Sequence, residues 1–435
     1  MSRLLLIAGV WLALATITSC RLVCYYDGEA ASRDSTGRFT PANIDPELCT
    51  HLIYAFAVID NQNKLVPINN NISLYKDLNN LKTKNSQLKT MLAVGGPNFD
   101  NQKFSTMVAA ANTRSSFITS AIALIKDNGF DGLNLDWQYP GDGQPQDKTR
   151  FTSLCQELRT AFQAENPPLL LSASVSAVKA MIDKSYEVAK IASEVDFLNV
   201  LTFGFHDTSE TKTAHHSPLG ALTAGDILTT EYAMAYWKNL GAPKNKLNMA
   251  FAAYGVAFTL TDPSNSGVGA PASGPAEPGC YGGTAGIWSY YEICLYIKGG
   301  DLRWIPEQSV PYTVTEGQWV GYDNTTSIDA KVKHIVDNGY GGACVWALDL
   351  DDYTGQFCQI GSNPFISHLK SKLPATTTTT TTGGDVCNGK TGLHPNPENN
   401  TTFYNCDHGT GTLQSCNADL IFCDSCKCCN RPSAC

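Results

Sequence analysis

The sequence has no cluster of basic residues and, after its first twenty residues, no long apolar run. Its formal net charge is −9 at pH 7. An acidic chain without a basic patch is not expected to bind nucleic acid or an anionic membrane surface. Because a membrane-spanning helix needs about 20 consecutive apolar residues, no membrane span is expected in the remainder of the chain either.

The apolar run that is present stands at the amino terminus, between Leu4 and Ile17, behind a single arginine and ahead of three small residues. This order is typical of a secretory signal peptide. A membrane anchor is the alternative, but the run is shorter than the ~20 residues that a spanning helix requires. We therefore assign residues 1–20 to a signal peptide and expect a secreted, extracellular protein.

Of the sixteen cysteines, Cys20 ends the expected signal peptide and the other fifteen fall into two groups. Seven lie between Cys24 and Cys358, and eight are crowded between Cys387 and Cys435. Cysteines in a secreted chain are expected to form disulfides, and a short cysteine-dense segment is typical of a module held together by them. Residues 374–386, which include seven consecutive threonines, have the composition of a linker. The predicted organisation is a large domain over residues 21–373, this linker, and a small disulfide-rich β module over 387–435.

Short apolar runs alternate with helix-like segments through the large domain. Repeated strand–helix alternation of this kind predicts an α/β fold, the (β/α)8 TIM barrel. The expected strands are Leu22–Tyr26, His51–Val58, Lys89–Val94, Gly132–Trp137, Leu169–Val175, Phe197–Phe203, Leu247–Tyr254 and Ala343–Leu348. The long interval before the last strand predicts an α+β insertion over about residues 255–330, with Ile287–Ile297 as one element.

Within the fourth expected strand, apolar and polar residues alternate. Asn134, Asp136 and Gln138 are separated by apolar residues. Because side chains alternate faces along a strand, these three polar groups are expected to share one face. In a barrel covered by helices, that face points to the axis, and its row ends at the carboxyl-terminal mouth where barrel enzymes carry out their chemistry.

The stretch from Asp131 to Gln138 resembles the Asp-x-x-Asp-x-Asp-x-Glu signature of family 18 glycoside hydrolases, the chitinases. The resemblance implies that the position of Gln138 belongs to the catalytic acid and that of Asp136 to the group that orients the substrate's N-acetyl group. It assigns Asn134 and Asp131 to a supporting chain of shared protons. Two positions depart from the signature, because Asn134 replaces an aspartate and Gln138 replaces the glutamate.

A glutamine side chain has no titratable proton to give to a departing sugar oxygen. Losing general acid catalysis alone costs ~10²–10⁴ in rate. Two other readings stay open. The polar row could be filler of a barrel interior, or another acid, Glu29 or Asp142, could replace the missing one if it were placed close to the substrate.

Further matches to the chitinases run from Arg21 to about Leu373, and they include the strand sequences around Cys49–Ala57 and Gly341–Asp352. They imply that Trp346 forms the floor beneath a bound sugar, although a core aromatic is an equal reading. Phe56, Tyr139 and Tyr25 are further candidates for substrate contact or scaffold. The family's cleft is altered at Pro97, Leu201, Phe203 and Gly204, which removes a stacking indole, a hydroxyl and a carboxylate.

The tail resembles the chitin-binding module of family 14, the peritrophin-A type. Its aromatic residues Phe403, Tyr404 and Phe422 are candidates for stacking on acetylglucosamine rings; in so small a module they could instead be its only core. An oxidising compartment favours disulfides over a zinc site here. The cysteines that the resemblance assigns to bridges are Cys387, Cys406, Cys416, Cys426, Cys428 and Cys429, with Cys423 and Cys435 as additions to the family's set.

In the large domain, the resemblance implies the disulfides Cys24–Cys49 and Cys294–Cys358. The remaining cysteines are interpreted from their surroundings. Cys155 lies on an apolar helical stripe and Cys344 in a buried strand, so both are expected to be buried thiols. Cys280, in a loop rich in glycine and proline, is the one expected to pair unusually.

Together these patterns indicate a secreted, lectin-like chitinase-like protein that binds chitin or chito-oligosaccharides without hydrolysing them and uses no cofactor or metal. The tail is expected to provide most of the hold on the polysaccharide. One alternative is an active endo-chitinase that hydrolyses β-1,4-linked N-acetylglucosamine polymer. The other is a signalling or structural protein, tethered to chitin, whose barrel contacts an unknown protein partner.

Overall fold

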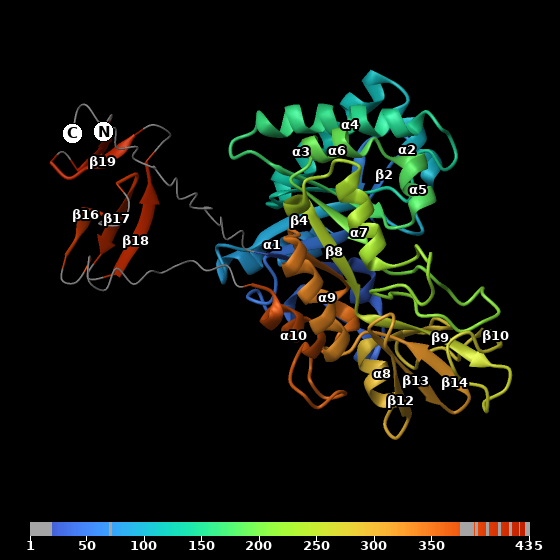
Figure 1. The fold of residues 1–435 in the computed structure, drawn as a ribbon. Coiled ribbons are helices and arrows are strands. Elements are labelled where there is room, and N and C mark those ends of the chain that lie inside the picture. Colours follow the sequence, from blue (N-terminus) through green and yellow to red (C-terminus); the bar gives the residue numbers. More distant parts are fainter. Residues whose placement is uncertain are drawn as a thin grey trace, which may run out of the picture. The chain divides into compact units, whose positions relative to one another are not determined.

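A computed structural model describes residues 20–68, 72–374, 387, 390–396, 400–407, 410–416, 420–425 and 427–430. Residues 20–374 form one compact unit and the described residues after 386 belong to another (Figure 1). The two are treated separately below. The expected signal peptide, except Cys20, and nearly all of the expected linker lie outside the described residues.

The large unit is built on eight parallel strands that close into a barrel. Pairing of β1 with both β2 and β15 completes the ring, whose order is β1-β2-β4-β5-β6-β7-β8-β15. The predicted (β/α)8 barrel is therefore confirmed, and all eight expected strands occur within a few residues of their expected bounds. They are β1 (Arg21–Asp27), β2 (His51–Ile59), β4 (Lys89–Gly95), β5 (Gly132–Asp136), β6 (Leu170–Ser176), β7 (Phe197–Leu201), β8 (Leu247–Ala252) and β15 (Gly342–Trp346).

Helices surround the barrel and cover the outward faces of its strands (Figure 1). Outward-pointing Leu133, Leu135 and Trp137 are buried in the layer between strands and helices, where Trp137 stacks on Phe104 with ring centroids 4.8 Å apart. The helices are α1 (Ile72–Asn80), α2 (Asn101–Val108), α3 (Ala111–Asn128), α4 (Asp147–Gln163), α5 (Lys179–Ser185), α6 (Val188–Glu194), α7 (Thr230–Asn239), α9 (Thr325–Asn338) and α10 (Pro364–Lys372).

Local sequence signals set the ends of these helices. Gly129 follows α3 with φ 79°, a left-handed conformation that glycine adopts without steric cost, and its N–H bonds back to the last turn. The Asn324 side chain accepts hydrogen bonds from the N–H groups of Thr326 and Ser327 and so begins α9. Each of these two helices is followed within a few residues by the next barrel strand, β5 after α3 and β15 after α9.

The expected insertion is present between β8 and α9. It contains an antiparallel sheet in the order β10-β9-β14-β13-β12, with β11 also paired to β9. The elements are β9 (Tyr254–Leu260), β10 (Ala272–Pro275), β11 (Ile287–Ser289), α8 (Tyr290–Tyr296), β12 (Asp301–Ile305), β13 (Val310–Thr315) and β14 (Gln318–Gly321). The sheet ends at Gly321, before the expected limit near 330, because the residues from Thr325 onward form barrel helix α9.

The interpretation of Ile287–Ile297 as a single element was wrong. A strand, β11, ends at Ser289, where the Ser289 N–H and Oγ each donate to Glu292 Oε2, at 2.9 and 2.7 Å. This capping pair begins α8 at the next residue. The local cap therefore divides an apolar run whose periodicity looked continuous.

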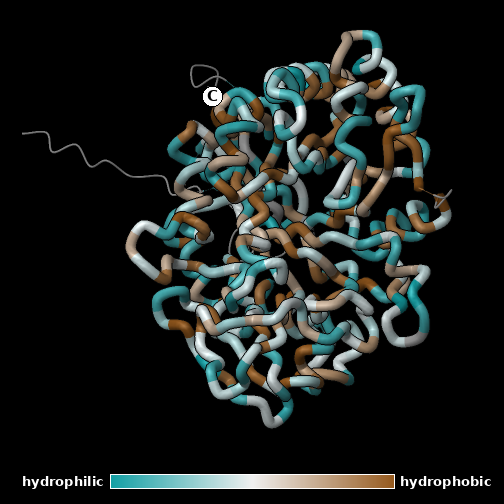
Figure 2. The backbone as a smooth tube through the Cα atoms, turned by 90° about the vertical axis from the view of Figure 1, so that its right-hand side faces the viewer, coloured by the Kyte–Doolittle hydropathy of each residue, from teal (hydrophilic) through white to brown (hydrophobic). Residues whose placement is uncertain are grey.

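No helix among the described residues is long and apolar enough to cross a membrane. Figure 2 shows that hydrophobic and hydrophilic stretches alternate over short distances along the backbone.

The tail contains two small antiparallel sheets, β16-β17-β18 and β19-β20. Disulfides join Cys387 to Cys406 and Cys416 to Cys429. Cys423 is also disulfide-bonded and faces Cys428 across the second sheet, while Cys426 and Cys435 lie outside the described residues. The strands are β16 (Gly392–Pro395), β17 (Thr402–Asp407), β18 (Thr410–Ser415), β19 (Ile421–Cys423) and β20 (Cys428–Asn430).

Candidate functional site

The polar row of β5 ends at the carboxyl-terminal mouth of the barrel, as its alternation predicted. Asp136, the last residue of the strand, is 3% exposed, and Gln138 follows it two residues later. The Gln138 Nε2 group donates a hydrogen bond of 2.8 Å to Asp136 Oδ1. Burial raises the pKa of Asp136 from its ordinary value of 3.8 to about 6, and the hydrogen bond from Gln138 partly opposes this rise.

Asn134 lies one step deeper, fully buried, in a chain of neutral hydrogen-bonding groups. Its Nδ2 donates to Ser172 Oγ at 2.9 Å, and its Oδ1 accepts from Ser174 Oγ at 3.0 Å. Ser174 Oγ is also 2.7 Å from the Tyr25 hydroxyl, which accepts a 2.8 Å bond from Asn199 Nδ2. Because the Ser174 proton is directed to Asn134, the Tyr25 proton is directed to Ser174.

The chain of donors therefore runs in one direction toward Asn134, and none of these groups is a carboxylate. An aspartate at position 134 would accept but could not donate to Ser172 unless it were protonated. The asparagine satisfies both neighbours without a shared proton. Asp136 is consequently left without an adjacent carboxylate inside the barrel.

Asp131 does not belong to this row, so its expected place in the proton chain was wrong. It precedes β5 at the amino-terminal end of the barrel, opposite the mouth. Its carboxylate pairs with Lys82 at 2.9 Å and accepts a 2.8 Å bond from the Thr90 backbone N–H. Asp131 thus fastens β5 to β4 and to the short helical turn Leu81–Thr83 that follows α1. The polar row itself begins at Asn134.

An open cavity of about 520 Å³ lies above Asp136 and Gln138. Within the described residues, Asp136 is the one carboxylate on its lining; most of the other lining groups are aromatic or aliphatic. The lining consists of Tyr25, Pro97, Asp136, Gln138, Tyr139, Leu201, Phe203, Gly204, Tyr254, Ile287, Cys344, Trp346 and Leu350. Such a largely apolar hollow with a few convergent polar groups is the usual form of a small-ligand site.

Trp346 forms part of this wall at the end of β15. Its ring is half-buried, with Phe56 stacked beside it at 5.7 Å and Tyr25 tilted against it at 5.5 Å. The structure therefore brings Trp346, Tyr139 and Tyr25 to one cavity, together with Pro97, Leu201, Phe203 and Gly204. Phe56 lines a smaller neighbouring cavity of about 210 Å³ that shares Trp346 and Pro97 with the first.

Sequence reasoning missed four lining residues. Tyr254 and Ile287 come from the insertion, Leu350 from the turn after β15, and Cys344 from β15 itself. The alternation of β5 contains no information about segments more than one hundred residues away. The free thiol of Cys344 is buried, as predicted, and so is that of Cys155, while Cys280 is exposed and unpaired.

The two acids considered as replacements for a catalytic glutamate lie elsewhere. Asp142 is exposed and forms an ion pair of 2.7 Å with Lys184. Glu29 lines the smaller cavity and not the larger one. Neither carboxylate lines the cavity that Asp136 and Gln138 line.

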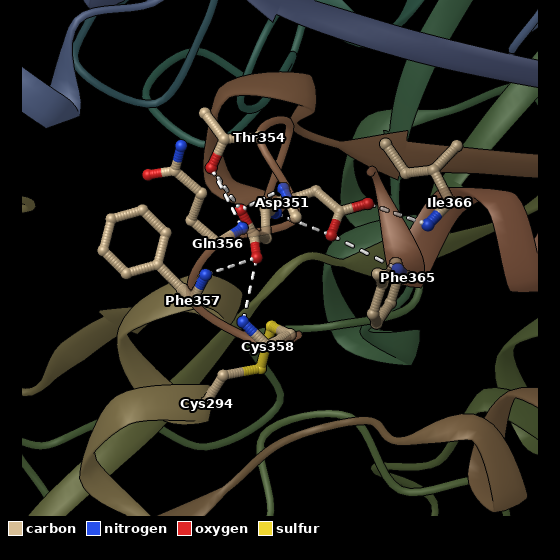
Figure 3. The surroundings of a disulfide bond; sticks show 10 residues. Cys294, Asp351, Thr354, Gln356, Phe357, Cys358, Phe365 and Ile366 are labelled. Carbon is tan, nitrogen blue, oxygen red and sulfur yellow. Dashed lines mark hydrogen bonds between the residues drawn. A yellow bond between two sulfur atoms is a disulfide. The ribbon is translucent and has the colours of Figure 1, made fainter. Parts of the chain in front are cut away.

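A disulfide holds the insertion to the segment that follows Trp346. Cys294 of α8 is bonded to Cys358, and Cys24 is bonded to Cys49, which confirms both expected pairs. Figure 3 shows the loop beside Cys358, where the Asp352 carboxylate accepts the N–H groups of Phe357 and Cys358, each at 2.9 Å. This arrangement fixes the insertion, and with it one wall of the cavity, against the barrel.

The neighbouring Asp351 also accepts hydrogen bonds from backbone N–H groups. Its carboxylate accepts the Ile366 N–H at 2.9 Å and the Phe365 N–H at 3.2 Å, at the first turn of α10 (Figure 3). Burial raises the pKa of Asp351 to about 7, although these hydrogen bonds favour the charged form. The two neighbouring aspartates thus support the cavity through backbone contacts and do not enter it.

In the tail, the three aromatic residues proposed for sugar stacking are largely buried, which favours the alternative that they form the core of the module. Phe403, Tyr404 and Phe422 are 8%, 6% and 6% exposed, and the rings of Phe403 and Phe422 stack with centroids 4.7 Å apart. A sugar ring needs an exposed aromatic face to stack on. These rings are instead the core of a module that has no other aromatic residue.

The fold and the site together define a (β/α)8-barrel protein of the chitinase type. The chain belongs to the Glycosyl hydrolases family 18, whose family model matches residues 21–351.

Its relatives include a protein named as a chitotriosidase and another described as a pseudo-chitinase. Chitotriosidase-1 of Mus musculus is 41% identical over 445 residues, covering 95% of both chains. Chitinase-3-like protein 2 of Homo sapiens is 41% identical over 84% of this chain and 95% of its own. Among solved structures, human YKL-39, described as a pseudo-chitinase with retained chitooligosaccharide binding properties, has a TM-score of 0.78 at 41% identity, covering 82% of this chain and 100% of that one.

Proposed function

We propose that this protein is a secreted, lectin-like member of family 18 that binds chito-oligosaccharides in its barrel cleft and does not hydrolyse them. The observation that carries the proposal is the 2.8 Å hydrogen bond from Gln138 Nε2 to Asp136 Oδ1. At the position of the family's acid there is an amide, which donates to Asp136 but has no proton to transfer to a leaving group.

Sequence identity alone does not separate the two activities. A chitotriosidase and a human pseudo-chitinase are both 41% identical to this chain. The amide at position 138 and the neutral surroundings of Asn134 support the proposal of binding without turnover. The cavity supports binding because Trp346, Tyr139, Phe203 and Tyr254 offer aromatic surface around one buried acid.

In this proposal, Asp136 orients the N-acetyl group of the bound sugar, as the family resemblance implies. Asp136 already accepts one hydrogen bond from Gln138, and its remaining lone pairs face the cavity that it lines. The tail module enters the proposal only as a second contact to insoluble chitin. That contact would use surfaces other than its three buried aromatic rings.

The test uses the purified full chain and a fully acetylated tetramer of N-acetylglucosamine. Release of reducing ends is measured beside calorimetric titration of the same sugar. We expect saturable binding without detectable hydrolysis. Hydrolysis at the pace of an ordinary chitinase would show that an unrecognised acid operates, and failure to bind any oligosaccharide would overturn the lectin proposal.

A chain that ends at Pro374 separates the contribution of the tail, since residues 20–374 form a compact unit with their own core. We expect it to bind the soluble tetramer as the full chain does. Weaker retention on insoluble chitin would then measure the tail's contribution. Loss of tetramer binding in the shortened chain would move the sugar site from the barrel to the tail.

A further inference from the structure

The smaller cavity beside Trp346 differs in charge from the larger one. It has a volume of about 210 Å³ and is lined by aromatic rings, among them Phe56, Phe99 and Trp346, and by the carboxylates Asp27 and Glu29. Because Trp346 and Pro97 line both cavities, the two cavities adjoin. A sugar chain that occupies the larger cavity would therefore have its neighbouring unit beside these two acids.

The carboxylate of Asp27 is already engaged. Its Oδ1 accepts the Glu29 backbone N–H at 3.0 Å, and its Oδ2 pairs with Arg33 Nη2 at 3.0 Å. Arg33 in turn reaches Asp349 through Nη1 at 2.7 Å. One guanidinium thus serves two carboxylates, so this group of three side chains offers no positive charge to balance another acid.

Glu29 is the second acid of the cavity, and it is differently placed. Its side chain is exposed in the short helical turn Gly28–Ser32, which follows β1 directly. In the described part of the chain, its carboxylate makes no hydrogen bond or ion pair. The cavity therefore combines aromatic faces with one uncompensated carboxylate, next to a group whose Asp27 and Asp349 outnumber their single cation.

This combination favours a cationic sugar over a neutral one. A fully acetylated unit presents a neutral amide, which gains little from an unpaired carboxylate. A deacetylated unit presents an ammonium group on the same ring, able to pair with a carboxylate and to lie near an aromatic face. We propose that the end of the cleft lined by Glu29 selects a glucosamine unit, so that the preferred ligand is a partially deacetylated chito-oligosaccharide. This inference rests on the proposed sugar-binding function of the same cleft.

The test compares two tetramers on the full chain by calorimetry, one fully acetylated and one that carries a single glucosamine. We expect the second to bind about twofold to fivefold more tightly, the range of an exposed ion pair, with the preference shrinking as salt is added. Glu29→Gln is expected to abolish the preference, so that the two tetramers bind this variant with equal affinity. Thermal unfolding at the temperature of the unaltered chain checks that the variant is folded.

Glu307→Gln is the matched control. It removes one charge from an exposed position that lines neither cavity. If both variants lowered the preference equally, the cause would be the net charge of −9 and not the site, and the proposal would fall. Equal binding of the two tetramers by the unaltered chain would also overturn it. Failure of both sugars to bind would instead overturn the proposed function of the cleft.

Discussion

The barrel cleft and the tail module use aromatic residues in opposite ways. In the barrel unit, large rings such as Trp137, Trp237 and Phe151 fill the core, so Trp346 and Tyr139 are free to line an open cavity. In the tail, the aromatic residues present are Phe403, Tyr404 and Phe422, and all three are buried. A large domain can leave rings exposed for ligands, whereas a small module must bury the rings it has.

The comparison teaches that an aromatic residue in a sugar-binding family is a candidate contact only where other residues supply the core. Among the described residues, the barrel unit combines a hollow and aromatic surface with a buried acid. We therefore propose that the main sugar contact lies in the cleft, although it was first expected in the tail.

The largest expected effect is on the stability of the tail. Phe422→Ala removes one ring of the stacked pair with Phe403 and is expected to lower the free energy of unfolding of the module by about 3–5 kcal/mol. Limited proteolysis and thermal unfolding of the full chain would detect this as early loss of the tail alone. If the module stayed folded but no longer bound chitin, Phe422 would be a ligand contact. The contrast between aromatic residues of the core in the tail and of the ligand site in the barrel would then be wrong.

Next in size is a pH dependence that belongs to the cleft. Because burial raises the pKa of Asp136 from 3.8 to about 6, the folded chain holds this proton in a range where the unfolded chain has lost it. The contribution of Asp136 to the free energy of unfolding therefore decreases as pH rises from about 4 to about 6, by about 3 kcal/mol at most. Urea unfolding of the unaltered chain and of Asp136→Asn, measured across this range, gives the difference.

Asp142→Asn is the control for this measurement, because Asp142 is exposed and ion-paired outside the cavity. Raised pKa values of Asp27 and Asp351 act in the same direction but are common to all three proteins. Only Asp136→Asn is expected to reduce the pH dependence of the free energy of unfolding. If Asp136→Asn and Asp142→Asn gave the same pH dependence, Asp136 would have its ordinary pKa in the folded chain.

A smaller effect is expected on affinity when the cleft loses its main ring. Trp346→Ala removes an aromatic face from both cavities and is expected to weaken binding of the acetylated tetramer about tenfold, or ~1.4 kcal/mol. The control is Trp304→Ala, since Trp304 is 39% exposed on β12 and lines neither cavity. If calorimetry found the same loss of affinity in the two variants, Trp346 would not be a sugar contact.

The smallest effect is expected from restoring the acid. Gln138→Glu places a carboxyl group beside Asp136, yet hydrolysis of the tetramer is expected to remain near that of the unaltered chain. Asn134 provides no neighbouring carboxylate, and Phe203 and Gly204 supply neither a hydroxyl nor a carboxylate to the substrate. Adding Asn134→Asp should raise the rate further than the single change. Robust activity of Gln138→Glu alone would show that the rest of the cleft was still intact.

Much of the large unit could be predicted from the sequence. The eight barrel strands follow from apolar runs separated by helix-like segments, and the two disulfides from Cys24 and Cys294 followed from the family resemblance. The chemistry at position 138 is also a matter of sequence, because an amide cannot act as a general acid wherever it is placed. The alternation in β5 correctly put Asn134, Asp136 and Gln138 on one face.

Alternation does not say what packs against a polar residue. Asp131 fits the signature but is bound to Lys82 at the closed end of the barrel. Tyr254 and Ile287 reach the cavity from an insertion that the Cys294–Cys358 disulfide joins to the loop around Asp352.

The sequence by itself therefore determined the barrel, the cysteine-dense tail and the amide at position 138, since each depends on residue type and local spacing. The tertiary structure decided which aromatic rings remain open to a ligand, which acids share a cavity and which carboxylate has no counter-ion. Exposure and charge balance depend on every neighbour that surrounds a side chain, and most of those neighbours are distant in sequence.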